Sequence, residues 1–432
     1  MTEAIIGFVA LFALIFARMP IGLALGIVGF CGYAMTVNVG PALALVGQTV
    51  RDVGLSYTLS VVPMFVLMGN LVARAGLAQD LYTAANAFIG HRKGGLAMAT
   101  IIACGGFASV SGSSVATAAT MSKVSFPAMR RYGYSDRLAA GAIAAGGTLG
   151  ILIPPSVIMV IYGVLTETHI GKLFAAGLLP GVIGILGYMA AVRYTVWRDP
   201  ASGPAGERVA WGERWLVLRG VLGVLMLFVL VMGGIYSGLF TPTEAAGVGA
   251  FGAAVFALFR RRLTWPIVYE ILSETARTTA MMFFVLMGAL VFAEFVSFSG
   301  MPEGLVEIVN GAGFPPLAVL VMMMLVYLVL GAILDSLAMI LLTVPVFFPI
   351  VMAFGYDPVW FGILVVVVVE IGLITPPIGL NVFVLNAMLP DVPASRIFRG
   401  VVPFIGADIL RLAVLLLFPP ISLLLPTLFF GN

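Results

Sequence analysis

The sequence predicts an all-α protein that crosses a lipid bilayer several times and is built from two halves of inverted topology. Of its 432 residues, 61% are hydrophobic and only 9% are charged, whereas a soluble globular chain carries about 25% charged residues. Several windows of roughly 18 or more residues are almost free of charge, which is enough to cross a hydrocarbon core of about 30 Å. They include 216–239, 280–298 and 412–428. An internal repeat is the third observation.

Two motifs of the first half return in the second half in the same order. Phe65–Val72 (FVLMGNLV) returns as Phe284–Val291 (FVLMGALV), at an offset of 219 residues. Gly150–Pro155 (GILIPP) returns as Gly372–Pro377 (GLITPP), at an offset of 222. Two pairs of single residues also have the offset of 222: Pro20 with Pro242, and Ser114 with Ser336. Because the motifs keep the same order and nearly the same offset, they indicate two copies of the same unit.

Basic residues orient these copies, because loops rich in Lys and Arg face the cytoplasm. The clusters placed on that side are 91–93, 130–137, 193–219 and 260–262. The segment 60–75 then leads inward, whereas its repeat mate 280–298 leads outward. The N-terminus is expected on the periplasmic side. Inverted repeats of this kind occur in many secondary transporters.

Two segments begin and end on the same side of the membrane, namely 96–126 and 317–350. Each could be two full spans or one re-entrant hairpin, and the parity of the crossings leaves both open. Arms of only about 13–16 residues are short for a span, and polar residues gather at the turns. These features favour two re-entrant hairpins.

The predicted elements group into five regions. Amphipathic arm helices near opposite interfaces are expected at 42–58 and 263–278, and a linker at 198–213. The regions are 1–59 with scaffold helices and the first arm, 60–197 with one hairpin, one broken helix and a return helix, 198–279 with the linker, scaffold helices and the second arm, 280–390 with the other hairpin and broken helix, and 391–432 as a C-terminal helix.

The densest group of hydroxyl side chains lies at the turn of the first hairpin, in Ser111–Thr117 (SGSSVAT). Non-helical backbone at membrane depth is tolerated only where it is buried in protein or lines a watery cavity. Its free carbonyl oxygens and hydroxyls are hard ligands, suited to an alkali cation, and the ends of half-helices add their dipoles. The alternative is a small-residue motif that packs helices together.

Diproline motifs are expected to break two helices, at about 136–164 and 358–388. Pro154-Pro155 follows the glycine-rich stretch 146–150, and Pro376-Pro377 follows Gly372. Proline removes a hydrogen-bond donor and clashes with the preceding turn. Breaks at matching places in two inverted halves predict interrupted helices that meet near the membrane midplane; the alternative is a pair of simple kinks.

Asp335 is the carboxylate that most suggests a functional site, because apolar stretches flank it on both sides. An acidic residue inside the membrane is a functional hypothesis by default, with a structural ion pair or helix cap as the alternative. Glu244, after Pro242, is interpreted as a helix cap, and Glu370 stays ambiguous.

Enzyme activity is not expected, because the sequence has only two histidines and lacks the HExxH, GxSxG and GxxxxGK[ST] motifs. No organic cofactor is expected either. The net charge of +3 is too small to suggest binding of nucleic acid.

The combined motifs resemble the large membrane subunit of TRAP (tripartite ATP-independent periplasmic) transporters. The resemblance covers nearly the whole chain and rests on four segments: Gly106–Thr117, Gly147–Ser156, Gly331–Asp335 with Pro345 and Pro349, and Gly372–Gly379. It implies an elevator-type ion transporter fold, in which a scaffold holds a moving transport domain with two hairpins and two broken helices. It further implies a multi-pass protein of the bacterial inner membrane, with the small subunit on a separate chain.

For function, the resemblance implies Na⁺-coupled uptake of an organic acid anion, such as a C4-dicarboxylate, sialic acid, another sugar acid or an oxo acid. The implied partners are a periplasmic substrate-binding protein and a small membrane subunit of about four helices. At least two Na⁺ sites are implied, one formed by Ser111, Gly112, Ser113, Ser114, Gly147, Thr148 and Gly150, the other by Gly331, Asp335, Ser336, Gly372 and Thr375. The implied substrate residues are Ser113, Ser114, Thr117, Pro155, Ser156, Ser336, Pro377 and Asn381.

The two turns are not equivalent, because hydrophobic Leu334 stands where the first repeat has Gly112. Two other functions remain open at this point. One is a stand-alone ion-coupled anion carrier or channel that needs no binding protein. The other is a membrane-embedded enzyme or a structural subunit of a larger complex.

Overall fold

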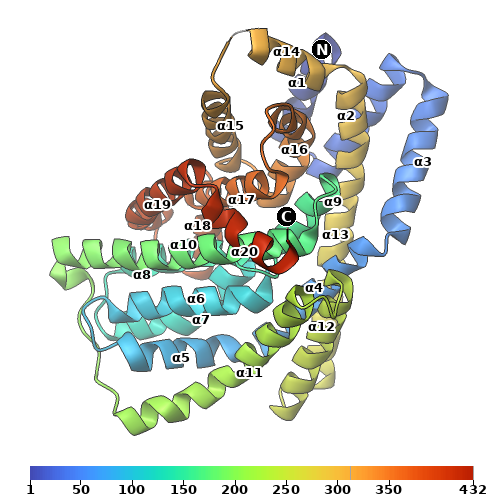
Figure 1. The fold of residues 1–432 in the computed structure, drawn as a ribbon. Coiled ribbons are helices and arrows are strands. Elements are labelled where there is room, and N and C mark those ends of the chain that lie inside the picture. The colour runs from blue at the N-terminus through green and yellow to red at the C-terminus, as the bar shows by residue number, and fades with distance from the viewer. Residues whose placement is uncertain (312, 432) are drawn as a thin grey trace.

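The computed structural model describes residues 1–311 and 313–431, and within them it contains helices and no strand. The prediction of an all-α fold is therefore confirmed (Figure 1). The helices of the first half are α1 (Thr2–Phe16), α2 (Ile21–Thr36), α3 (Val39–Leu55), the 3-10 turn η1 (Thr58–Ser60), α4 (Val61–Arg74), α5 (Leu77–Ile89), α6 (Gly95–Ser111), α7 (Ser114–Arg131), α8 (Asp136–Thr148), the 3-10 turn η2 (Leu149–Ile151), α9 (Val157–Leu165) and α10 (Ile170–Arg198).

The second half repeats this order of elements. It comprises the 3-10 turn η3 (Pro200–Ser202), α11 (Trp211–Tyr236), α12 (Pro242–Phe259), α13 (Trp265–Phe298), α14 (Met301–Gly311), α15 (Pro316–Gly331), α16 (Ser336–Ala353), α17 (Pro358–Ile374), α18 (Leu380–Met388), α19 (Ala394–Leu417) and α20 (Pro420–Phe430). Each half thus carries a helical hairpin, α6–α7 or α15–α16, followed by a helix that is interrupted at its diproline.

Six helices of the described chain are long and apolar enough to cross a membrane: α10, α11, α12, α13, α16 and α19. The pair of α3 with η1 and α4, bent by 57°, could add a seventh span. The scarcity of charge in these helices is what makes crossing possible. The chain is a multi-pass membrane protein, as its sequence predicts.

Helix α17 lies at the centre of the molecule (Figure 1), and every residue from Val359 to Ile374 is buried. Its sequence is apolar on all sides, with a run of five valines at 365–369. A helix without a polar face has to be enclosed by other helices. Helices α15, α16, α10 and α19 surround it, so the second diproline motif emerges from the core of the molecule.

Helices of each half pack against helices of the other half. Helix α2 packs against the second part of α13, whereas its counterpart α12 packs against α4. In the same way, α9 packs against the hairpin helix α16, and α18 against the hairpin helix α7. This reciprocal packing brings the hairpin of each half beside the broken helix of the other.

The arm of the second half differs from the prediction. Residues 263–278 and 280–298 were expected to form separate helices, but α13 continues from Trp265 to Phe298. In the first half, the hydroxyl of Ser56 accepts a hydrogen bond from the Leu59 N–H at 3.2 Å, which competes with helix formation and ends α3. The stretch 277–282 (RTTAMM) contains no helix breaker. The predicted boundary between two helices at residues 279 and 280 is therefore wrong.

The C-terminal region also differs from the prediction. Instead of one helix over 391–432, the structure has α19 and α20, separated at Phe418-Pro419. Pro419 and Pro420 cannot continue a helix, because they lack the N–H group that its backbone requires. Between α13 and α15 the chain forms the short helix α14.

Candidate functional site

The first hairpin turns within two residues, Gly112 and Ser113. Gly112 adopts a left-handed conformation with φ of +61°, which favours glycine because it has no Cβ. The hydroxyl of Ser113 then caps α7 by accepting a hydrogen bond from the Ala116 N–H at 3.3 Å. Across the turn, the hydroxyls of Ser111 and Thr117 lie 3.0 Å apart, and that of Thr117 donates to the Ser113 carbonyl at 2.7 Å.

The first broken helix is interrupted between Thr148 and Val157. The chain passes through η2 and the Pro154-Pro155 cis peptide bond. Ser156 restarts the helix, because its hydroxyl donates to the Ile151 carbonyl at 2.6 Å and accepts from the Met159 N–H at 3.4 Å. The helix therefore stops at Thr148 and begins again at Val157, on the two sides of this break.

Glycines allow the first hairpin turn to contact the first break directly. A Cβ atom added to Gly150 would lie 2.6 Å from the carbonyl oxygen of Ser113, and one added to Gly112 would lie 2.9 Å from that of Pro155. Real Cβ atoms essentially never approach other atoms below 3.0 Å. Only residues without a side chain permit this approach, so the turn 111–114 and the break 147–150 come together, as the resemblance implies.

The second turn meets the second break through the same kind of contact. A Cβ atom on Gly372 would lie 2.6 Å from the carbonyl carbon of Gly331, and the Ile378 N–H donates to the Ala332 carbonyl at 3.2 Å. The half-buried Asp335 caps α16, because its Oδ1 accepts from the Ala338 N–H at 2.7 Å. The structure thus gives Asp335 the capping role that was its alternative, and leaves its other oxygen for a further contact.

Two of the predicted Na⁺ residues, Thr148 and Thr375, form hydrogen bonds through their hydroxyls with groups outside the hairpin turns. Thr148 donates to the Ala145 carbonyl at 2.7 Å and lies 2.9 Å from the Tyr188 hydroxyl, and Thr375 donates to the Ile371 carbonyl at 2.6 Å. The Thr148 hydroxyl therefore takes part in the buried contacts with α8 and α10. Within the described chain, no group of three or more His, Cys, Asp or Glu side chains could hold a metal ion. The oxygen atoms at the turns are hydroxyls and backbone carbonyls.

The predicted substrate residues differ in their access to solvent. Five are buried (Ser114, Thr117, Pro155, Ser156 and Asn381), two are half-buried (Ser113 and Ser336), and Pro377 is exposed. Asn381 is completely enclosed and donates from Nδ2 to the Ala144 carbonyl of α8 at 3.2 Å. The structure therefore brings only Ser113, Ser336 and Pro377 to accessible positions.

A buried chain of polar side chains connects the two breaks, and sequence reasoning missed most of it. The Thr148 hydroxyl contacts that of Tyr188, which donates to the Asp408 carboxylate at 2.6 Å. Arg411 pairs with Asp408 at 2.8 Å and with Glu370 at 2.5 Å. These five side chains come from α8, α10, α19 and α17 and are all buried. The available signal was the presence of Asp408 and Arg411 three residues apart in the otherwise apolar stretch 400–417.

This network places one guanidinium and two carboxyl groups in the protein interior. Burying a charge is expensive unless it is paired and hydrogen-bonded, and here one guanidinium serves two carboxylates. Gly184 of α10 lies directly against the Arg411 side chain, so that a Cβ atom there would collide with the guanidinium. The position of Arg411 is thus fixed by helix packing as well as by charge.

Glu244 caps a helix, as its position after Pro242 predicts, and two arginines form ion pairs at the surface. Glu244 forms a capping box with Thr241, in which each residue accepts a hydrogen bond from the other's backbone N–H. Arg74 pairs with Glu270 at 2.6 Å on the surface of the molecule. At the turn before α19, the Arg130 guanidinium binds Asp391 and holds the pKa of that carboxyl below its usual range.

Comparisons with known proteins identify the family of this chain. The family described as "Tripartite ATP-independent periplasmic transporter, DctM component" matches residues 8–421. The C4-dicarboxylate TRAP transporter large permease protein of Pseudomonas aeruginosa is 40% identical over 350 residues, which cover 81% of this chain and 81% of that protein. The sialic acid TRAP transporter large permease protein of Vibrio cholerae is 36% identical over 357 residues, covering 81% and 82%.

Among solved structures, the YdaH transporter of Alcanivorax borkumensis has a similar fold. Its TM-score is 0.63 at 15% sequence identity, and the match covers 88% of each chain. The family match over almost the whole length, together with relatives above 30% identity, confirms the resemblance inferred from the motifs. The chain belongs to the DctM family, the large permease component of the tripartite ATP-independent periplasmic transporters.

Proposed function

We propose that this permease imports an organic acid anion together with Na⁺ across the bacterial inner membrane. The observation that carries the proposal is the glycine-mediated contact of each hairpin turn with a helix break, Gly150 with Ser113 and Gly372 with Gly331. Each contact gathers backbone carbonyls and hydroxyls at the ends of half-helices, where oxygen ligands for an alkali cation are expected. Na⁺ is a co-transported substrate in this proposal.

Na⁺ bound at the two turns would prepare the site for the anion. A carboxylate is costly to hold at membrane depth unless positive charge lies nearby. Cations that order the turns reduce this cost and give positive cooperativity between Na⁺ and substrate. Half-buried Ser113 and Ser336, one at each turn, are the residues that we expect to contact the anion.

We further propose an elevator mechanism, in which the hairpins and broken helices move together against the remaining helices. Support comes from the reciprocal packing of α9 on α16 and α18 on α7, which ties both hairpins and both broken helices into one unit. A periplasmic binding protein is proposed to deliver the anion, and a small membrane subunit to enlarge the scaffold. The substrate class proposed first is a C4-dicarboxylate, because the 40% identical relative carries that name.

The test is uptake by proteoliposomes that contain this chain together with its proposed small subunit and binding protein. Uptake of radiolabelled succinate, sialic acid and a keto acid is measured with an inward Na⁺ gradient and again with choline replacing Na⁺. We expect uptake of one class of anion, and only with the Na⁺ gradient. Full uptake in choline buffer would overturn Na⁺ coupling, and full uptake without the binding protein would overturn the tripartite assembly.

A further inference from the structure

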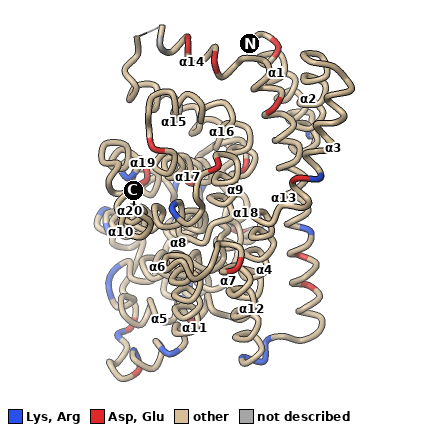
Figure 2. Tube along the Cα trace, turned by 45° about the vertical axis from the view of Figure 1, so that its right-hand side comes forward, with Lys and Arg blue, Asp and Glu red and all other residues tan. Residues whose placement is uncertain are grey.

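Lys and Arg residues gather at one end of the molecule, around the ends of α5, α11 and α12 and beside α10 (Figure 2). Part of this group surrounds the place where α8 and α19 cross. There Gly141 and Gly400 bring the two backbones into contact, since a Cβ atom on Gly141 would lie 2.6 Å from the Gly400 carbonyl carbon. The close crossing sets Arg137 of α8 beside Arg399 of α19.

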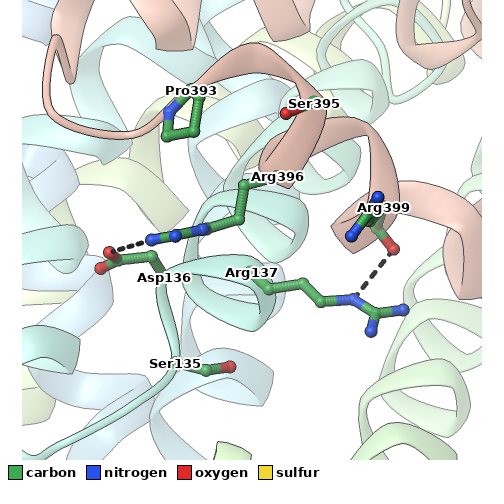
Figure 3. Close-up of a pocket in the computed structure, with 7 residues that line it drawn as sticks. All are labelled: Ser135, Asp136, Arg137, Pro393, Ser395, Arg396 and Arg399. Carbon is green, nitrogen blue, oxygen red and sulfur yellow. Dashed lines mark hydrogen bonds and ion pairs between the residues drawn. The ribbon is translucent and has the colours of Figure 1, made fainter.

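Two cavities open on either side of Arg137. One, of about 560 Å³, lies between the first turns of α8 and α19 and is lined by Arg137, Arg396 and Arg399 (Figure 3). The other, of about 540 Å³, lies between α10 and α19 and is lined by Arg137, Arg198 and Tyr194. Arg137 donates from Nε to the Arg399 carbonyl at 3.1 Å, which holds its side chain between the two cavities.

Several of these arginines have no carboxylate partner. Among the described residues, Arg137, Arg198 and Arg399 form no ion pair. Asp136 also lines the first cavity, but Arg130 neutralises it at 2.8 Å and Arg396 lies 3.5 Å from it. Asp199 lines the second cavity. Arginines therefore outnumber carboxylates around both cavities, and a guanidinium fork suits the oxygens of a phosphate group.

Exposed apolar side chains lie further along α10 and α19, the two helices that form the second cavity. On α10, Leu186 and Val182 are 59% and 50% exposed, and on α19, Val402 and Leu410 are 60% and 67% exposed. The helices contact each other along their length. From Arg198 back to Val182 the helix rises by about 24 Å at roughly 1.5 Å per residue, most of a hydrocarbon core of about 30 Å.

Two aromatic residues mark the boundary between the basic and the apolar parts. Trp197 is 76% exposed and Tyr194 is 50% exposed, and Arg198 donates to the Tyr194 hydroxyl at 3.2 Å. Exposed Trp and Tyr side chains favour the level of the lipid headgroups. The order from arginine to aromatic to aliphatic side chains matches the order from phosphate to acyl chain in a phospholipid.

We propose that the groove between α10 and α19 binds an anionic phospholipid, with its phosphate held by Arg137 and Arg198, which line the same cavity. The acyl chains lie along the exposed faces of α10 and α19. Basic pockets between transmembrane helices bind such headgroups by charge. A free phosphate ion shares the headgroup chemistry, but it leaves the adjoining apolar faces unexplained, and for this reason a lipid is the assigned ligand.

The test is native mass spectrometry of the full chain, purified in a nonionic detergent and supplied with phosphatidylglycerol or phosphatidylcholine. Wild-type protein should retain phosphatidylglycerol in preference to phosphatidylcholine. Each arginine near a membrane surface strengthens binding of anionic lipid about fivefold, so the double variant Arg137→Gln/Arg198→Gln should weaken retention roughly 25-fold. Both positions are exposed, and unchanged thermal melting of the variant shows that it is folded.

The matched control is Arg261→Gln/Arg262→Gln, which removes two arginines from the turn between α12 and α13 without touching the groove. It should change retention less than twofold. Equal losses in the two double variants would overturn the site and indicate nonspecific attraction to charge. Displacement of phosphatidylglycerol by millimolar inorganic phosphate would overturn the assignment to lipid in favour of a soluble anion.

Discussion

The two halves of this permease share a backbone plan but differ in charge at matching positions. At the offset of 222 residues, Ser113 corresponds to Asp335 and Thr148 to Glu370. Ser113 and Asp335 both cap the second helix of their hairpin, since a hydroxyl and a carboxylate can each accept the N–H hydrogen bond at a helix start. The repeat therefore preserves hydrogen-bond geometry, while the second half alone adds negative charge to it.

The halves also differ in how far their helix breaks are covered. Pro154 and Pro155 are buried, whereas Pro376 and Pro377 are exposed. Thr148 and Glu370 occupy equivalent positions beside these breaks and form the two ends of one buried network through Tyr188, Asp408 and Arg411. The comparison teaches that the repeat supplies two similar sites, and that one asymmetric set of side chains connects them.

The largest expected effect comes from removing the cation of this network. Arg411→Met leaves the buried carboxylates of Glu370 and Asp408 without a partner, and breaking a buried ion pair costs about 3–5 kcal/mol. The thermal midpoint of the purified chain, followed by circular dichroism or tryptophan fluorescence, should fall steeply. The exposed Arg396→Met is the matched control, for which we expect a change within about 0.5 kcal/mol.

A compensated variant sharpens this prediction. Arg411→Met combined with Glu370→Gln and Asp408→Asn removes the charges together, so much of the lost stability should return, because an apolar or neutral replacement of a buried ion pair is often tolerated. A triple variant as unstable as Arg411→Met alone would show that packing of the guanidinium, rather than charge balance, stabilises this region.

The next effect concerns the contacts between turns and breaks. Gly150→Ala would place a methyl group 2.6 Å from the Ser113 carbonyl oxygen, and such overpacking costs about 1–3 kcal/mol. We expect Na⁺-dependent uptake to fall at least tenfold. Gly372→Ala, its repeat mate, should behave alike because its contact with Gly331 is equally close.

Gly47→Ala provides the control for both glycine variants. No other residue lies within 4 Å of a Cβ atom at this position of α3, so alanine should be neutral or slightly stabilising, by roughly 0.5–1 kcal/mol. Wild-type uptake in Gly150→Ala would refute an ion site at the first turn, and a difference between Gly150→Ala and Gly372→Ala would show that the two sites contribute unequally.

A smaller effect separates the two roles of Asp335. Asp335→Ser copies the cap found at Ser113 and should keep stability within about 0.5 kcal/mol, whereas Asp335→Ala loses the cap at a cost of about 1 kcal/mol. If the carboxylate also assists Na⁺, both variants should raise the Na⁺ concentration for half-maximal uptake, by about fivefold. An unchanged Na⁺ dependence in Asp335→Ser would leave Asp335 with capping alone.

The smallest effect concerns the surface ion pair that joins the halves, Arg130 with Asp391. The pKa of the Asp391 carboxyl is lowered from its ordinary 3.8, chiefly by its hydrogen bond with Arg130. The stabilisation is therefore present above pH 3.8 and is lost as the pH falls through the lowered value. Asp391→Asn should shift the midpoint of thermal melting slightly at pH 7 and not at pH 2; an equal shift at both values would contradict this assignment.

Much of the architecture could be predicted from the sequence, because its signals are local. The apolar windows identify membrane helices, the glycine and hydroxyl residues at 111–114 identify a turn, and the diprolines identify two breaks, since each acts through the backbone of its own segment. The repeat offset also predicted which elements of the two halves are equivalent. The continuous helix α13 was missed because a similar arm ends at Ser56 in the first half, and a repeat does not require the same local hydrogen bond twice.

By itself the sequence determined an all-α membrane protein of two related halves, with hairpin turns and helix breaks at known residues. Only the tertiary structure decided how closely each turn contacts its break and how far each break is covered. It also joined Thr148 to Tyr188, Asp408, Arg411 and Glu370, whose contacts bridge separations of up to 220 residues. The physical reason is that burial and pairing of charges depend on the packing of several helices at once, which no segment encodes alone.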